Sequence, residues 1–180
     1  MAHQEPKQEI INKLTRLLLP SIQKIPAGTM GEESKNRTLR FVKERSLPGR
    51  RAYIVIVEDR HGNEVHFTCY VEQDRNGNWQ FRGAEGDGIM GGNPGPVVER
   101  AWANLGGGGM PDHFYAGGFV ANHGQNVAYV HLVTKNGTVI EDSVDDNMVL
   151  FLTDQRVELP VEAELYDQEN QLLYRHKVLG

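Results

Sequence analysis

The sequence predicts an α+β protein that is mainly β, with N-terminal helices, an antiparallel meander and a C-terminal Ig-like β-sandwich. Three observations predict this class. Apolar residues recur every three or four positions near the N-terminus, the period changes to two after residue 51, and turns rich in Gly, Asn and Asp then separate short apolar runs. A chain of 180 residues fits one domain, or one domain with an appendage.

The N-terminal segment, residues 1–50, is expected to be helical. Residues 5–25 place Ile and Leu on one stripe, and most Lys and Arg residues lie away from it, as in an amphipathic helix. Pro20 is expected to kink or end this helix, because proline has no amide proton to donate. A second, weaker helix is expected over residues 32–44.

The segment 51–112 is expected to hold the meander. Residues 52–57 are apolar on both faces, as in a central strand, whereas residues 64–72 alternate between apolar and polar side chains. A third strand is expected over 79–83. The turns DRHGN and DRNGN between these runs place Gly beside Asn or His, which favours tight hairpins.

A Gly-rich loop and a short helix follow the meander. The helix is expected over 96–105, with Pro at its first turn and the four glycines 106–109 after its end. Six short alternating runs within 113–180 then predict the antiparallel sandwich. The alternative is one continuous domain over 51–180.

Charge is distributed unevenly along the chain. The net charge is −5, but residues 1–51 carry eleven Lys and Arg against five Asp and Glu. The candidate interaction surface consists of Lys35, Arg37, Arg40, Lys43, Arg50 and Arg51. We expect this basic segment to dock on acidic surface, such as 141–169, of the same protein or of a partner, which includes a homodimer. A nucleic-acid partner is disfavoured because no aromatic platform accompanies the basic residues.

The sequence predicts a cytoplasmic protein with no membrane partner. The N-terminus lacks a secretory signal pattern, and the longest apolar run is too short to span a bilayer. Cys69 is the only cysteine, so the chain has no internal disulfide, and its place on an apolar strand face predicts a core residue. No cofactor motif and no zinc-type spacing occur, so no cofactor and no metal are expected.

The stretch EGDGIMGGNPGP at 85–96 is the candidate ligand loop. A phosphate cradle is disfavoured because the loop has no lysine. A calcium loop beginning at Asp74 is disfavoured because Trp79 stands where the EF-hand needs glycine. A movable flap or an interface is the preferred interpretation of the loop. Its candidate ligand-binding residues are Asp87, Gly88, Gly91 and Gly92.

Catalytic constellations are scarce in the sequence. Glu64, His66 and Tyr70 share one face of a predicted strand and are the only weak catalytic candidates. We therefore expect a non-enzymatic binding or assembly module that acts through protein–protein interaction. The alternative is a small-molecule-binding protein or enzyme, with a site between that strand face and the Gly-rich loop 83–95.

Overall fold

The computed structural model describes residues 5–18, 39–58, 64–87 and 100–180. Within these ranges the chain forms one helix and three antiparallel sheets, which confirms the predicted mainly-β α+β class. The elements are α1 (Pro6–Leu18), β1 (Leu39–Leu47), β2 (Arg50–Glu58), β3 (Glu64–Gln73), β4 (Trp79–Asp87), β5 (Trp102–Met110), β6 (His113–Ala121), β7 (Tyr129–Thr134), β8 (Val139–Ser143), β9 (Met148–Thr153), β10 (Val161–Tyr166) and β11 (Leu172–Leu179).

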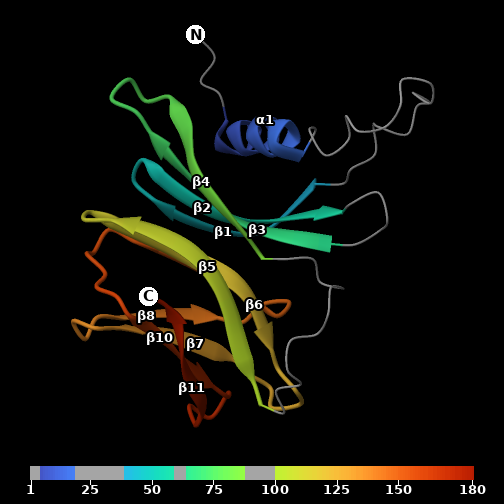
Figure 1. Ribbon diagram of the computed structural model, residues 1–180, viewed down its shortest axis with the longest axis vertical. Helices are drawn as coiled ribbons and strands as arrows, with labels where there is room; N and C mark the ends of the chain where they lie inside the picture. The colour runs from blue at the N-terminus through green and yellow to red at the C-terminus, as the bar shows by residue number, and fades with distance from the viewer. Residues whose placement is uncertain (1–4, 19–38, 59–63, 88–99) are drawn as a thin grey trace.

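The three sheets and the helix form four stacked layers (Figure 1). The N-terminal sheet has the strand order β1-β2-β3-β4, the central sheet β5-β6-β9, and the C-terminal sheet β11-β10-β7-β8. The helix covers the outer face of the N-terminal sheet, and the central sheet lies between the other two. Each pair of neighbouring layers therefore encloses a core.

The outermost core lies between α1 and the N-terminal sheet. Ile10 and Leu14, which are spaced one helical turn apart, pack on Tyr53, Val55 and other residues of β2 and β3. Cys69 belongs to this core, as the sequence predicts, and burial raises the pKa of its thiol to about 12. Among the described residues, no helix combines the length and the apolar character needed to cross a membrane.

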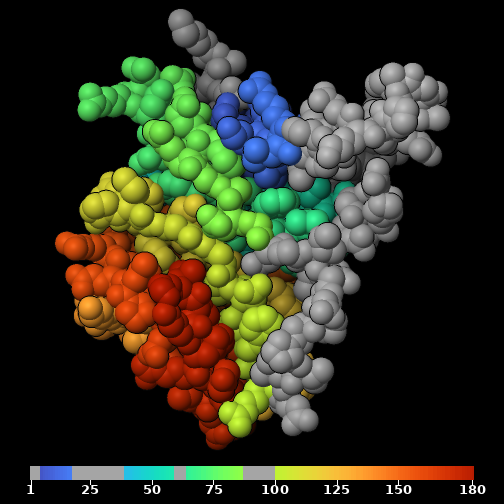
Figure 2. All heavy atoms as spheres, in the orientation of Figure 1, coloured from blue at the N-terminus to red at the C-terminus, as the bar shows by residue number. Residues whose placement is uncertain are grey.

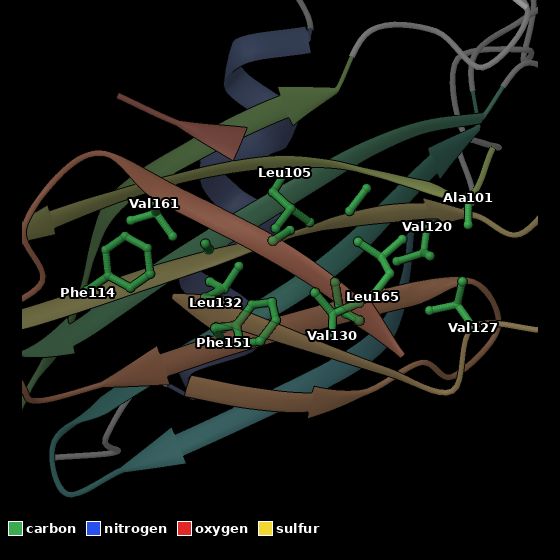
Figure 3. Packing of buried hydrophobic residues seen from close by; sticks show 14 residues of the cluster. Ala101, Leu105, Phe114, Val120, Val127, Val130, Leu132, Phe151, Val161 and Leu165 are labelled. Carbon is green, nitrogen blue, oxygen red and sulfur yellow. The ribbon is translucent and has the colours of Figure 1, made fainter. Parts of the chain in front are cut away.

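The central sheet is buried on both faces, because alternate side chains of one strand enter two different cores. On β6, Phe114 and Ala116 face the C-terminal sheet, whereas Tyr115 faces the N-terminal sheet. Figure 3 shows the first of these cores, in which Phe114 and Phe151 lie among the aliphatic side chains of the C-terminal sheet. At one edge of the sandwich β11 lies against β5 (Figure 2), and His176 Nε2 is 2.9 Å from the carbonyl oxygen of Ala103.

The helix predicted over 32–44 is wrong where the structure describes it, since residues 39–44 belong to β1. Leu39 and Phe41 are two residues apart, and both pack in the core beneath α1. That spacing places two side chains on one face of a strand but on different sides of a helix. The first predicted helix is observed over Pro6–Leu18, and residues 19–38 lie outside the described ranges.

The helix predicted over 96–105 is also wrong at its described end, because residues 102–105 begin β5. Ala101, Ala103 and Leu105 alternate with more exposed residues and enter the core of the sandwich. The four glycines 106–109 continue the strand rather than ending a helix. Glycine is needed at Gly107, where a Cβ atom would lie 2.7 Å from Ala116 Cα on the neighbouring strand.

A β-bulge in β1 turns a lysine into the interior. The register passes from Phe41 opposite Val55 directly to Lys43 opposite Ile54, so Val42 is the extra residue. Phe41 therefore faces α1, whereas Lys43 points to the other side and reaches β9 of the central sheet. Without the bulge the two side chains would share one face.

The ammonium group of Lys43 is held by four oxygen atoms from the β8–β9 region. Its Nζ lies 2.7 Å from Asp142 Oδ2 and 2.9 Å from Asp145 Oδ2, and it donates to the carbonyl oxygens of Ser143 (2.5 Å) and Met148 (3.2 Å). The Asp142 side chain is only 2% exposed. It also accepts hydrogen bonds from Arg45 and from the amide of Leu150. This cluster joins the N-terminal sheet to the sandwich.

Replacing Lys43 with methionine is expected to destabilise the protein by about 3 kcal/mol, because the buried Asp142 carboxylate loses one of its two cationic partners. Arg40→Met is the matched control on the same strand, since Arg40 pairs with Glu64 while about half of each side chain is exposed. That control is expected to cost less than about 1 kcal/mol. Urea denaturation measures both, and equal losses would contradict the importance assigned to the buried cluster.

Replacing Gly107 with alanine is expected to cost about 2 kcal/mol, because the added methyl group meets the backbone of β6 at Tyr115 O and Ala116 Cα. Gly109→Ala is the control, since its Cβ would lie 3.2 Å from its nearest neighbours, His113 O and Phe114 Cδ2, and needs a shift of only a few tenths of an ångström. Thermal denaturation should place the Gly107 variant clearly below the Gly109 variant. The reverse order would contradict the close strand approach.

Candidate binding site

The predicted catalytic residues Glu64, His66 and Tyr70 lie on one face of β3, but this face is covered by the central sheet. His66 and Tyr70 are 4% and 1% exposed, so they are not on an open wall. Glu64 Oε2 lies 3.8 Å from His66 Nε2. Four residues of strand place Tyr70 roughly 13 Å further along. The structure therefore brings the first two residues near each other and leaves Tyr70 apart.

Tyr70 is held in a stack of three rings between the N-terminal and central sheets. Its ring centroid lies 4.8 Å from that of His113 and 4.9 Å from that of Tyr115, with interplanar angles of 18° and 8°. Burial raises the pKa of the Tyr70 hydroxyl to about 12. Within the described ranges this hydroxyl has no hydrogen-bond partner. Tyr70 is thus a core residue with a neutral phenol at physiological pH.

The imidazole at the end of this stack is fixed by an ion-pair chain. His113 Nδ1 lies 3.0 Å from Asp112 Oδ1, and Arg50 Nη2 lies 2.5 Å from Asp112 Oδ2. Arg50 is also 3.4 Å from Glu72. The chain ties the β5–β6 turn to β2 and β3. It orients the ring of His113 against Tyr70, which is a structural use of the Asp–His pair.

The basic residues of the predicted interaction surface have partners within the chain wherever they are described. Besides the buried Lys43, Arg40 pairs with Glu64 at 2.5 Å, and Arg51 pairs with Glu44 at 2.7 Å. Arg50 is engaged in the ion-pair chain described above. Lys35 and Arg37 lie outside the described residues. Less of this surface is free for a partner than its charge alone predicts.

The Gly-rich candidate loop lies mostly outside the described residues. Asp87 is the last residue of β4 and stands in register with His66, whereas Gly88, Gly91 and Gly92 are not described. The segment from Asp74 to Asn78 is a tight turn. In this turn, Asp74 Oδ1 accepts hydrogen bonds from the amides of Asn76 and Asn78 at 2.8 and 2.9 Å. The described part of the chain contains no group of three or more metal-ligating side chains.

An open polar cleft lies instead at one end of the sandwich. It has a volume of about 730 Å³ and is lined by residues 122, 125–129, 143–144 and 167–169. These residues come from the β6–β7 loop, the end of β8 and the β10–β11 turn. The strand register explains why they meet, because Tyr129 pairs with both Ser143 and Tyr166. All three connections therefore leave the sheet at the same end.

The walls of this cleft are held by side chains that bond to backbone. Asn122 Oδ1 accepts from the amide of Val127 at 2.9 Å, and Gln125 Oε1 accepts from the amide of Ala101 at 3.0 Å. Asp167 Oδ1 accepts from the amides of Glu169 and Gln171, both at 2.9 Å. Val127 also belongs to the sandwich core (Figure 3), which fixes the floor. These hydrogen bonds and the packing of Val127 hold the loops in place.

The sequence contains a signal for this cleft that its patterns alone do not resolve. The turns NHGQN (122–126) and DQENQ (167–171) are both rich in amide side chains, but in the sequence alone such turns indicate only connections between strands. They lie more than forty residues apart in the chain, and only the strand order brings them together. The sequence alone therefore does not identify Tyr129, Asn126 and Gln168 as candidate site residues, although they line the cleft.

Replacing Tyr70 with phenylalanine is expected to leave stability at pH 7 unchanged or to raise it by up to about 1 kcal/mol, because a buried hydroxyl without a partner is removed. Tyr166→Phe is the control. It loses a 2.7 Å hydrogen bond to Glu164 and is expected to cost about 1 kcal/mol. A clear loss in the Tyr70 variant would show that its hydroxyl has a partner.

The same variant tests the ionisation of Tyr70. The folded state holds the pKa of this phenol at about 12 against an ordinary value of 10.0. Below pH 10 the phenol is neutral in both the folded and the unfolded state, and between pH 10 and 12 it ionises first in the unfolded state, so the free energy of unfolding falls. Over that interval the free energy of unfolding of the wild type should therefore fall relative to that of Tyr70→Phe. Urea denaturation from pH 8 to 11 measures it, and a constant difference would contradict the assignment.

Comparison of the chain with protein-family models, with curated proteins and with solved structures gives no match.

Proposed function

We propose that the protein is a non-enzymatic binding module and that its ligand or partner occupies the cleft at the loop end of the sandwich. The observation that carries this proposal is the cleft itself, built from three connections and ordered by side chain–backbone hydrogen bonds. Loops on a rigid scaffold are the usual place for recognition residues. Two buried cores on either side of the central sheet supply that rigidity here.

We further propose that β5–β11 form an Ig-like sandwich on which a short β1–β4 meander is mounted. The strand orders β5-β6-β9 and β11-β10-β7-β8 support this proposal, since three antiparallel strands face four in such sandwiches. In antibody variable domains the loops gathered at one end of the sandwich bind the antigen. This likeness concerns architecture, and the functional argument depends on the cleft.

A protein partner, including a second copy of the chain, is the class of occupant that the sequence predicts for this module, and the cytoplasm is its expected location. The single cysteine, buried in the core under α1, fits a reducing compartment without depending on it. The alternative is an enzyme or small-molecule site between Glu64, His66, Tyr70 and loop 83–95. It has less support because His66 and Tyr70 are packed between two sheets.

The proposal is tested by blocking the cleft. Gln168 lies in its wall and makes no side-chain hydrogen bond within the described ranges, so Gln168→Trp should fill the cleft without disturbing the fold. Gln155→Trp is the matched control, because Gln155 is exposed after β9, at the opposite end of the sandwich. Both variants should melt near the wild-type temperature.

A thermal-shift screen of the wild type would cover basic and acidic peptides, sugars, nucleotides and divalent ions, with sedimentation analysis for self-association. A bound ligand must raise the melting temperature, because it binds only the native state. We expect at least one class to give a shift that is lost in Gln168→Trp and kept in Gln155→Trp. Shifts that both variants keep would place binding elsewhere and overturn the proposal.

A further inference from the structure

We propose that the cleft binds a neutral carbohydrate. This proposal rests on the proposed function, because it names the class of ligand that the cleft would bind. The argument uses the charge of the cleft, its unused hydrogen-bonding groups, its aromatic side chain and its size. Each of these properties is set by residues from different connections, so the site is a product of the fold rather than of one loop.

The charge of the lining excludes anionic ligands. None of the residues that line the cleft is Lys, Arg or His, although phosphate and carboxylate ligands are usually bound by such side chains. Two carboxylates, Asp167 and Glu169, are present and would repel an anion. Nucleotides and sugar phosphates are therefore poor candidates, whereas a neutral ligand meets no repulsion. A basic peptide would be attracted by the two carboxylates, and its binding is a separate outcome of the test below.

The hydrogen-bonding groups left open in the cleft match hydroxyl groups. Because the Oε1 atom of Gln125 and the Oδ1 atom of Asp167 are engaged, their Nε2 and Oδ2 atoms remain for a ligand. The amides of Asn126 and Gln168 have no side-chain partner in the described part of the chain. An amide offers both a donor and an acceptor, and a sugar hydroxyl both donates and accepts. The site can thus bond several adjacent hydroxyls.

An aromatic side chain stands at the edge of the cleft. Tyr129 lines it and pairs across the strands with Tyr166, whose ring packs against His131 at 4.5 Å. Cross-strand partners share one face of a sheet, so the two tyrosines lie beside each other. A tyrosine ring offers a flat apolar face together with a polar edge. The C–H face of a sugar ring can pack on such a face while its hydroxyls reach the amides.

Size and preorganisation fit the same ligand. A volume of about 730 Å³ exceeds one sugar ring and suits two or three linked rings in an open cleft. Only Val127, Ala128 and Val144 are apolar among the lining residues, whereas pockets for drug-like molecules are mostly apolar. Because the loop side chains are already bonded to backbone, little ordering is needed on binding.

The test uses a matched pair of Asn→Gly variants. Asn126 lines the cleft with φ 52°, and Asn170 lies in the β10–β11 turn outside the lining with φ 59°. Glycine adopts both angles without strain, so Asn126→Gly removes the amide while keeping the loop, and Asn170→Gly controls for the backbone change. Circular dichroism and melting temperature establish that both variants fold.

Binding of maltose, cellobiose, lactose and N,N′-diacetylchitobiose is measured by isothermal calorimetry and by chemical-shift titration up to millimolar concentrations. We expect at least one to bind the wild type, to bind Asn126→Gly about tenfold more weakly, and to bind Asn170→Gly as the wild type does. Absence of binding by all four, or equal weakening in both variants, overturns the carbohydrate assignment. If a peptide binds and Gln168→Trp abolishes that binding while the sugars do not bind, the module proposal stands and only the ligand class fails.

Discussion

The arrangement of the three sheets depends on one buried ion cluster, in which Lys43 of β1 meets Asp142 of β8. A lysine that leaves water needs a partner for its charge, and here two carboxylates and two carbonyl groups surround it. Buried ion pairs add little net stability, because desolvation offsets most of their attraction. We infer that this cluster acts on specificity, since another docking of the N-terminal sheet would separate the buried Lys43 from its carboxylates.

This docking has two consequences for the surface. It places the central sheet over the polar face of β3, so His66 and Tyr70 enter the interior instead of lining an open wall. Lys43 also bonds the carbonyl oxygens of Ser143 and Met148 at the two ends of the β8–β9 connection. Ser143 itself lines the cleft, together with Val144. The same contact therefore closes one candidate site and steadies the wall of the other.

The sequence predicts the strands well where the period of two is unbroken. The change of period after residue 51 predicts a mainly β chain, and the three antiparallel sheets confirm that class. The prediction is wrong at β1 and β5 for different reasons. In β1 the bulge adds Val42 and breaks the alternation. Leu39, Phe41 and Val42 therefore resemble the apolar stripe of a helix in the sequence. In β5 the glycines 106–109 resemble a helix stop, although Gly107 is needed for close strand packing.

The candidate site is less predictable than the fold, because it depends on contacts between distant segments. Alternating polar residues on a strand predict that one face of the sheet is exposed to solvent, which holds when only the other face is covered. In this protein the central sheet covers the polar face of β3, and the sequence of β3 does not reveal it. The amide-rich turns at 122–126 and 167–171 are visible in the sequence. Their meeting depends on the pairing of β7 with β10, which no local pattern encodes.

Three groups whose pKa is raised chiefly by burial lie in the cores and not at the cleft. Catalytic sites bring groups with shifted pKa values together at a cleft. In this protein burial alone raises the pKa of Cys69, and burial is also the largest cause of the raised pKa values of Tyr70 and Tyr115, all of which lie within cores. The cleft, by contrast, is lined by amides, hydroxyls and two carboxylates near solvent. Groups of that kind offer several hydrogen bonds to a ligand, which supports the proposal that the cleft is a binding site.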